Sequence, residues 1–243
     1  MNDDIKGMWE KVNLSVNSTQ EEIRSLLNKG KELYQMEDYA KGLEVLTKCV
    51  DEDPDNLEAH YILGLIYTKK KDFNRAILHF NEITQSRYQY LYVYQVRSIL
   101  SYIYSMQGDY ESAKEQLTEV LKYNEKDIKS LSIMGYIYYK EKDYNTAKEY
   151  YTKILGIDGE NANAYNSLGV IEIELEENVE KGISICKRAL ELQPDTPAYL
   201  DSIGWGYYKI NDEIKAIGYL RKAFEKAPDN QEIKNHLKAI LNI

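Results

Sequence analysis

Apolar residues recur along this chain with the spacing of helices, in pairs of short segments joined by a tight turn. In one such pair, Leu63 and Tyr67 share a face of the first segment, and Ala76 and Phe80 share a face of the second. Residues 71–73 form the turn between them. The unit predicted here is a helical hairpin.

Two series of small residues show that this hairpin is repeated six times. The first series lies in the first segment of each copy, at Gly30, Gly64, Ser101, Gly135, Gly169 and Gly204. The second series follows twelve or thirteen residues later, at Gly42, Ala76, Ala113, Ala147, Gly182 and Ala216. A fixed period of about 34 residues is typical of stacked helical repeats. Small residues in both helices let the two helices of a hairpin pack closely.

This pattern resembles the tetratricopeptide repeat family over residues 23–230. The resemblance implies an all-α fold, a right-handed superhelical solenoid of stacked antiparallel helix pairs. A six-repeat solenoid is expected over 21–230, with repeats at about 23–56, 57–93, 94–127, 128–161, 162–196 and 197–230.

The turns carry their own signals. Asp–aromatic pairs mark the turn inside four repeats, at Asp38-Tyr39, Asp72-Phe73, Asp109-Tyr110 and Asp143-Tyr144. Prolines follow the second helix at Pro54, Pro194 and Pro228, where one helix must stop.

Two junctions between or within repeats are irregular. Residues 87–94 alternate with tyrosine and are expected to form a lengthened helix or a loop rather than a strand, and residues 174–178 hold one extra residue.

The two ends differ from the repeats. Residues 231–243 are expected to form a capping helix that covers the last apolar face. Ser18 and Thr19 each precede a glutamate by three residues, a capping-box signal that places the first repeat helix near residue 20. Residues 1–20 before it are expected to be either a tail or a short amphipathic helix. The segment around Trp9 could then contact the first repeat or mediate self-association.

Composition narrows the classes of partner. The net charge of −9 and the absence of any lysine or arginine block argue against nucleic acid. No apolar run is long enough to span a membrane. A disulfide between Cys49 and Cys186 is excluded, because four repeats separate the two thiols. We expect a cytoplasmic, bacterial protein, although a trimmed export signal would not be visible in this sequence.

The chain lacks the sequence motifs of common metal-binding, nucleotide-binding and catalytic sites. No zinc, phosphate-binding or dinucleotide-binding motif is present, and no cofactor, metal or catalytic residue is predicted. The chain holds three histidines, and His60 occupies a position where a packing role is expected. The sequence therefore indicates a protein that is not an enzyme.

A binding surface is expected on the inner face, because the first helix of each repeat lines that face in the resembled family. The ninth position of the repeats is mostly apolar or aromatic here. The candidate residues of a peptide-binding groove are Tyr61, Leu65, Tyr102, Tyr136, Val170, Trp205 and Tyr208. Large apolar side chains that face water often mark a binding surface, so we expect a groove that binds an apolar peptide or helix. The alternative is that strong curvature packs these side chains against one another.

The function predicted is a protein–protein interaction scaffold. The carboxylate clamp by which some members of the resembled family hold a peptide C-terminus is expected to be absent, since Leu27, Ile62 and Ile99 stand where charged donors are needed. Two alternatives remain open. The chain could be a regulatory or targeting part of a larger enzyme or sensor. It could also be an assembly factor for a cell-envelope complex, because residues 201–209 resemble bacterial envelope-associated repeats.

Overall fold

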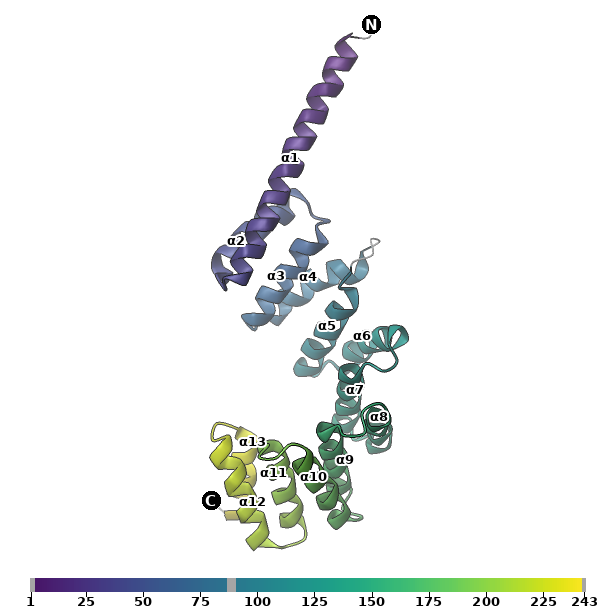
Figure 1. The fold of residues 1–243 in the computed structure, drawn as a ribbon, viewed down its shortest axis with the longest axis vertical. Helices are drawn as coiled ribbons and strands as arrows, with labels where there is room; N and C mark the ends of the chain where they lie inside the picture. Colours follow the sequence, from purple (N-terminus) through teal and green to yellow (C-terminus); the bar gives the residue numbers. More distant parts are fainter. Residues whose placement is uncertain (1–2, 87–90, 242–243) are drawn as a thin grey trace. The chain divides into compact units, whose positions relative to one another are not determined.

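The computed structural model describes the backbone of residues 3–86 and 91–241, and the side chains of residues 19–86 and 91–241. Within these residues it contains thirteen α-helices and no strand (Figure 1). The helices are α1 (Asp3–Gln35), α2 (Tyr39–Glu52), α3 (Leu57–Lys69), α4 (Phe73–Gln85), α5 (Val93–Gln107), α6 (Tyr110–Tyr123), α7 (Ile128–Lys140), α8 (Tyr144–Ile157), α9 (Ala162–Leu175), α10 (Val179–Leu192), α11 (Pro197–Lys209), α12 (Glu213–Lys226) and α13 (Gln231–Leu241). The predicted all-α array of six repeats and one further helix is confirmed for this part of the chain.

The chain forms two compact units. Unit 1 comprises residues 1–107 with helices α1 to α5, and unit 2 comprises residues 108–243 with helices α6 to α13. The boundary between them lies inside the third predicted repeat. The two series of small residues continue across it, at Ser101 and Ala113, so the repeat pattern gives no sign of this boundary.

The Asp–aromatic pairs of the sequence are helix starts. In each pair the aspartate is the N-cap of the second helix, and its carboxylate accepts a hydrogen bond from the backbone N–H three residues later. The residue just before the cap takes a left-handed backbone conformation, at Glu37, Lys71, Gly108 and Lys142. One left-handed residue and one capping aspartate therefore suffice to reverse the chain between the two helices of a hairpin.

The expected start of the first repeat helix near residue 20 is wrong. Helix α1 runs without interruption from Asp3 to Gln35, so Ser18 and Thr19 lie inside it. A capping residue needs a non-helical backbone, and nothing between residues 10 and 20 enforces one, since this stretch holds neither proline nor glycine. Serine and threonine cost a helix interior only tenths of a kcal/mol. The side chain of Trp9 lies outside the described residues, so its contacts stay a prediction.

The two irregular junctions have local explanations. Of the tyrosine-rich junction, residues 87–90 lie outside the described residues, Leu91 and Tyr92 form a turn, and α5 begins at Val93. In the longer turn between α9 and α10, Glu176 takes the left-handed conformation and Asn178 caps α10 through the Lys181 N–H. An asparagine thus replaces the capping aspartate where the aromatic partner is missing.

Unit 1 has its core between successive helix pairs. Leu46 and Leu63 belong to one buried cluster, and Phe80 and Leu100 belong to the next.

A pair of histidines lies beside this core. His60 Nδ1 is 3.0 Å from His79 Nδ1, and His60 Nε2 is 3.0 Å from the carbonyl oxygen of Pro54. Because that carbonyl only accepts, His60 Nε2 donates to it and His79 Nδ1 donates to His60, so the geometry fits two neutral rings.

This histidine pair predicts that unit 1 loses stability in acid. Burial, and secondly the charge of His60, lowers the pKa of His79 to about 4. An unfolded histidine titrates near 6.5, so the unfolded chain binds more protons between these two values, and stability falls as the pH drops from about 6.5 to about 4. Because the ring is partly exposed, we expect a loss on the order of 1–2 kcal/mol.

The substitution His79→Asn tests this, since it keeps a donor for His60 but cannot titrate. Thermal unfolding followed from pH 7 to pH 4 should show a smaller decrease of Tm for the variant than for the wild type. Equal decreases would assign the acid sensitivity to other groups.

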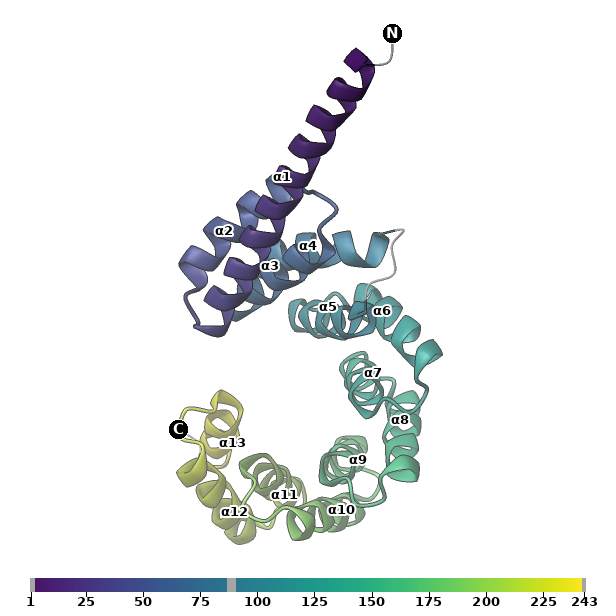
Figure 2. The same cartoon turned by 45° about the horizontal axis from the view of Figure 1, so that its top comes forward.

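Unit 2 is an arc of helix pairs. Helices α7, α9 and α11 lie along the inner side of the arc, and α8, α10 and α12 lie along its outer side (Figure 2). Helices α9 and α10 pack closely. A Cβ added to Gly169 would lie 2.8 Å from the Gly182 carbonyl oxygen, and one added to Gly182 would lie 2.7 Å from the Gly169 carbonyl oxygen. Both small-residue series therefore meet backbone to backbone at this crossing.

Helix α13 closes the end of unit 2. Its Ile233 and Ile240 are buried against α11 and α12, as the capping-helix prediction requires. Leu241, next to Ile240 in the chain, is exposed. Among the described residues, none of the helices combines the length and the apolar character needed to cross a bilayer.

Candidate functional site

A pocket opens on the inner side of unit 2. Helix α9 contributes Val170, Ile173 and Glu174, and helix α11 contributes Asp201, Ser202 and Trp205. The pocket has a volume of about 70 Å³ and opens to solvent. We call it the Trp205 pocket. Ile173 and Asp201 are both buried, so the lining of the pocket combines an apolar group with a buried carboxylate.

Two further helices complete the Trp205 pocket. Tyr139 reaches it from α7, and Glu232 and His236 reach it from α13. The capping helix therefore does more than cover apolar residues, because it supplies two of the polar groups of the pocket. Asn230 fixes the start of α13, since its side-chain oxygen accepts the backbone N–H groups of Glu232 and Ile233 at 2.9 and 3.2 Å.

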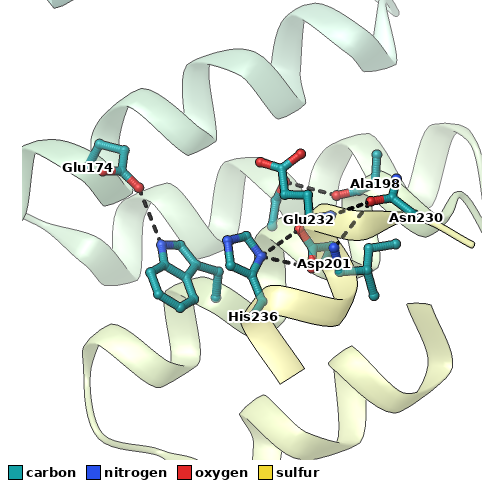
Figure 3. A network of polar contacts seen from close by, with 9 residues as sticks. Glu174, Ala198, Asp201, Asn230, Glu232 and His236 are labelled. Carbon is teal, nitrogen blue, oxygen red and sulfur yellow. Dashed lines mark hydrogen bonds and ion pairs between the residues drawn. The ribbon is translucent and has the colours of Figure 1, made fainter. Parts of the chain in front are cut away.

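An ion pair joins α11 to α13 inside the pocket. His236 Nδ1 lies 2.9 and 3.0 Å from the two carboxylate oxygens of Asp201, and Figure 3 shows the two side chains facing each other. Burial lowers the pKa of His236, but the hydrogen bond and charge of Asp201, followed by the charges of Glu232 and Glu174, outweigh burial, so the pKa is raised above its usual value. Asp201 is itself buried, and a buried carboxylate requires such a partner.

Trp205 is held on several sides. Its ring stacks on His236 with centroids 4.3 Å apart, and Tyr208 tilts against it at 5.1 Å. Its indole N–H donates to Glu174 Oε1 at 3.3 Å, the contact drawn in Figure 3. The Lys209 ammonium lies 5.6 Å from the ring centroid. These contacts fix the indole in place.

The ion pair predicts a measurable change in the pKa of His236. In the substitution Asp201→Asn, burial should dominate, and the pKa of His236 should fall. The wild-type pair contributes stability that is fully present below about pH 6.5 and is lost as the pH rises through the folded-state pKa. An NMR titration of the His236 ring measures both states. Glu191→Gln, on the outer helix α10, is the control and should leave the titration unchanged; an unchanged titration in Asp201→Asn would contradict the pairing.

The structure divides the seven predicted groove residues between the two units. Val170 and Trp205 line the Trp205 pocket, and Tyr208 contacts Trp205. Tyr136, also in unit 2, is 42% exposed and lies outside the pocket lining. Tyr61, Leu65 and Tyr102 belong to unit 1.

The residues in unit 1 differ in how far they are packed. Tyr61 stacks on Tyr92 at 5.4 Å, and Leu65 packs on the cluster around Phe80. Tyr102 is 49% exposed. Some of these side chains therefore serve packing, and others face solvent, so their role in a groove stays a prediction.

The acidic and imidazole groups of the pocket do not follow from the repeat pattern of the sequence. Asp201 and His236 are 35 positions apart and meet only because α13 folds back on α11. A usable signal was present: Asp201 stands between the buried positions Leu200 and Ile203 of a helix, where a charge needs a partner.

Comparison with known families agrees with this architecture. A family model for a tetratricopeptide repeat matches residues 27–89, and the model for the tetratricopeptide repeat protein 21 C-terminal ARM domain matches residues 83–203. The TPR repeat-containing protein PA4667 of Pseudomonas aeruginosa is 36% identical over 78 residues, which cover 32% of this chain and 13% of that protein. The chain thus matches only a small part of this relative.

Solved structures share the fold at low sequence identity. A tetratricopeptide repeat protein from Parabacteroides merdae superimposes with a TM-score of 0.80 at 16% identity, covering 90% of this chain and 86% of that one. PilW, a type IV pilus biogenesis factor, gives 0.68 at 13% identity, with 88% and 98% covered. The Cut9–Hcn1 complex gives 0.68 at 16% identity, and the match covers 97% of this chain and 46% of that one.

The helix pairs with capped turns, the close contacts at the two small-residue series and the matched family models all have one explanation. The chain is a member of the tetratricopeptide repeat family.

Proposed function

We propose that this protein is a non-enzymatic scaffold that binds a segment of another protein on the first-helix face of its repeats, with the Trp205 pocket as the principal contact. The family and fold are those of protein-interaction scaffolds in general. The observation that carries the specific proposal is the pocket itself, an open pocket of about 70 Å³ in which a tryptophan lies among carboxylates. Tryptophan and tyrosine anchors in such cavities supply much of the energy of protein interfaces.

Two exposed aromatic residues, one in each unit, are further candidate contacts for a partner. Tyr136 presents 42% of its surface on α7 in unit 2, and Tyr102 presents 49% on α5 in unit 1. Both are first helices of their repeats. A tyrosine ring combines a large apolar area with a hydroxyl group that donates and accepts hydrogen bonds. A cytoplasmic location is part of the proposal, supported by two free cysteines, each of them buried.

Affinity capture from the native cell extract tests the proposal. We expect the substitution Trp205→Ala, and separately the pair Tyr102→Ala and Tyr136→Ala, to reduce the retained partner tenfold or more, because anchor residues contribute about 2 kcal/mol or more each. The control is Ile214→Ala, which removes an 87% exposed apolar side chain from the second helix α12 and should retain the partner at the wild-type level.

Two results would contradict the proposal. One is an equal loss in the Ile214→Ala control. The other is a loss that follows the melting temperature of each variant, since this would assign the aromatic residues to packing alone.

A further inference from the structure

The Trp205 pocket carries an excess of negative charge. Three carboxylates line it, those of Glu174, Asp201 and Glu232, against one imidazole, that of His236. Even with His236 protonated, two negative charges remain unbalanced. Walls of low dielectric constant concentrate the field of such charges within a cleft, which raises the local concentration of a cation.

Two of these carboxylates have no basic partner within the part of the chain that the structure describes. Asp201 is paired with His236, whereas Glu174 accepts only the indole N–H of Trp205, and Glu232 forms no ion pair with a lysine or arginine. Nearby Lys209 forms its ion pair with Glu176 at 2.6 Å, and its charge interacts more weakly with Glu174. The pocket thus keeps two acceptor groups beside aromatic rings, with an opening to solvent.

The pKa values of Tyr139 and His236 are affected by these negative charges. Burial, followed by the charge of Glu174 and then those of Tyr144 and Glu232, raises the pKa of Tyr139 to about 12. The pKa of His236 is raised as well, against the effect of its burial. Both shifts have the sign that nearby negative charge produces.

We propose that the Trp205 pocket binds an arginine side chain of the partner segment, with Glu174 and Glu232 as acceptors and Trp205 and Tyr139 as aromatic walls. This inference rests on the proposed function and names the chemistry of its ligand. A guanidinium group is planar, presents five donors and matches carboxylates with paired hydrogen bonds. It also stacks on aromatic rings and is less strongly hydrated than an ammonium group, so its transfer into a half-closed pocket costs less.

Model peptides test the inference without the native partner. The probes are a blocked pentapeptide with one central arginine between leucines and the same peptide with citrulline, which is neutral and has the same shape. In the Trp9→Phe background, Trp205 is the sole tryptophan, so its fluorescence reports binding. We expect the arginine peptide to bind at least tenfold more tightly than the citrulline peptide and to lower the pKa of His236, since a bound cation disfavours a second one.

The double substitution Glu174→Gln and Glu232→Gln should abolish the arginine preference, and Glu191→Gln should leave it intact. If the double variant does not fold, the single Glu232→Gln, at an exposed position, should reduce the preference severalfold. Equal binding of the two peptides, no binding at millimolar concentration, or a preference that survives the double substitution would overturn the inference.

The two proposals fail in different ways. A native partner captured through Trp205, together with equal binding of the two peptides, would refute the arginine site and leave the scaffold function standing. Arginine-selective peptide binding together with no loss of captured protein in Trp205→Ala would refute the scaffold contact and support the site.

Discussion

Replacing Gly182 with alanine is expected to destabilise unit 2 by about 3 kcal/mol and to lower its melting temperature by roughly 10 °C. The added Cβ would lie 2.7 Å from the Gly169 carbonyl oxygen and 3.0 Å from the Ile173 backbone nitrogen. Backbone atoms of a neighbouring helix cannot rotate away, so α9 and α10 would have to separate along their whole contact.

Gly218→Ala is the matched control, because it makes the same chemical change in another second helix. Gly218 is an exposed residue of α12, and a Cβ added there would have no neighbouring atom within 4 Å. Alanine there should stabilise the helix by about 0.5–1 kcal/mol. Denaturant unfolding of both variants measures the difference. A Gly182→Ala protein as stable as the wild type would contradict the close helix contact.

Replacing Phe80 with alanine is expected to destabilise unit 1 by about 3–5 kcal/mol. The ring is fully buried and lies over Gly64, so close that a Cβ on Gly64 would meet it at 2.4 Å. Its loss would leave a cavity between α3 and α4 that backbone movement cannot fill. Large aromatic truncations in a packed core combine the lost transfer energy with the cost of this cavity.

The control, Leu78→Ala, removes an apolar side chain of the same helix α4 that is 65% exposed, and should cost less than about 0.5 kcal/mol. Hydrogen exchange of the α3 and α4 amides reports the stability of this region separately from the rest of the chain. Similar exchange in the two variants would show that Phe80 is not a core residue.

Local rules account for most of what the sequence predicted correctly. Gly169 and Gly182 indicated a close helix crossing, and the structure has backbone contacts there. The aspartates of the turn pairs needed a helix start to cap, and they cap one. These features depend on residues that are near in the chain or repeat with a fixed period, so a pattern reveals them.

The features that sequence patterns did not reveal depend on competition or on distant contacts. Ser18 lies inside a continuous helix despite its capping signal, because a helix propagates without a further signal once the residues on both sides are helical. The Trp205 pocket depends on the position of α13, which brings His236 to Asp201 across 35 residues. No period connects those two residues. The boundary between the two units, after Gln107, also cannot be recognised in the repeat pattern of the sequence.

The central claim is that a partner contacts the first-helix face around the Trp205 pocket. Hydrogen–deuterium exchange of the protein with its captured partner tests this most directly. We predict slower exchange in α9, α11 and α13, which supply most of the pocket, and unchanged exchange in α10 and α12. Slower exchange confined to α10 and α12, with α9, α11 and α13 unchanged, would contradict the account.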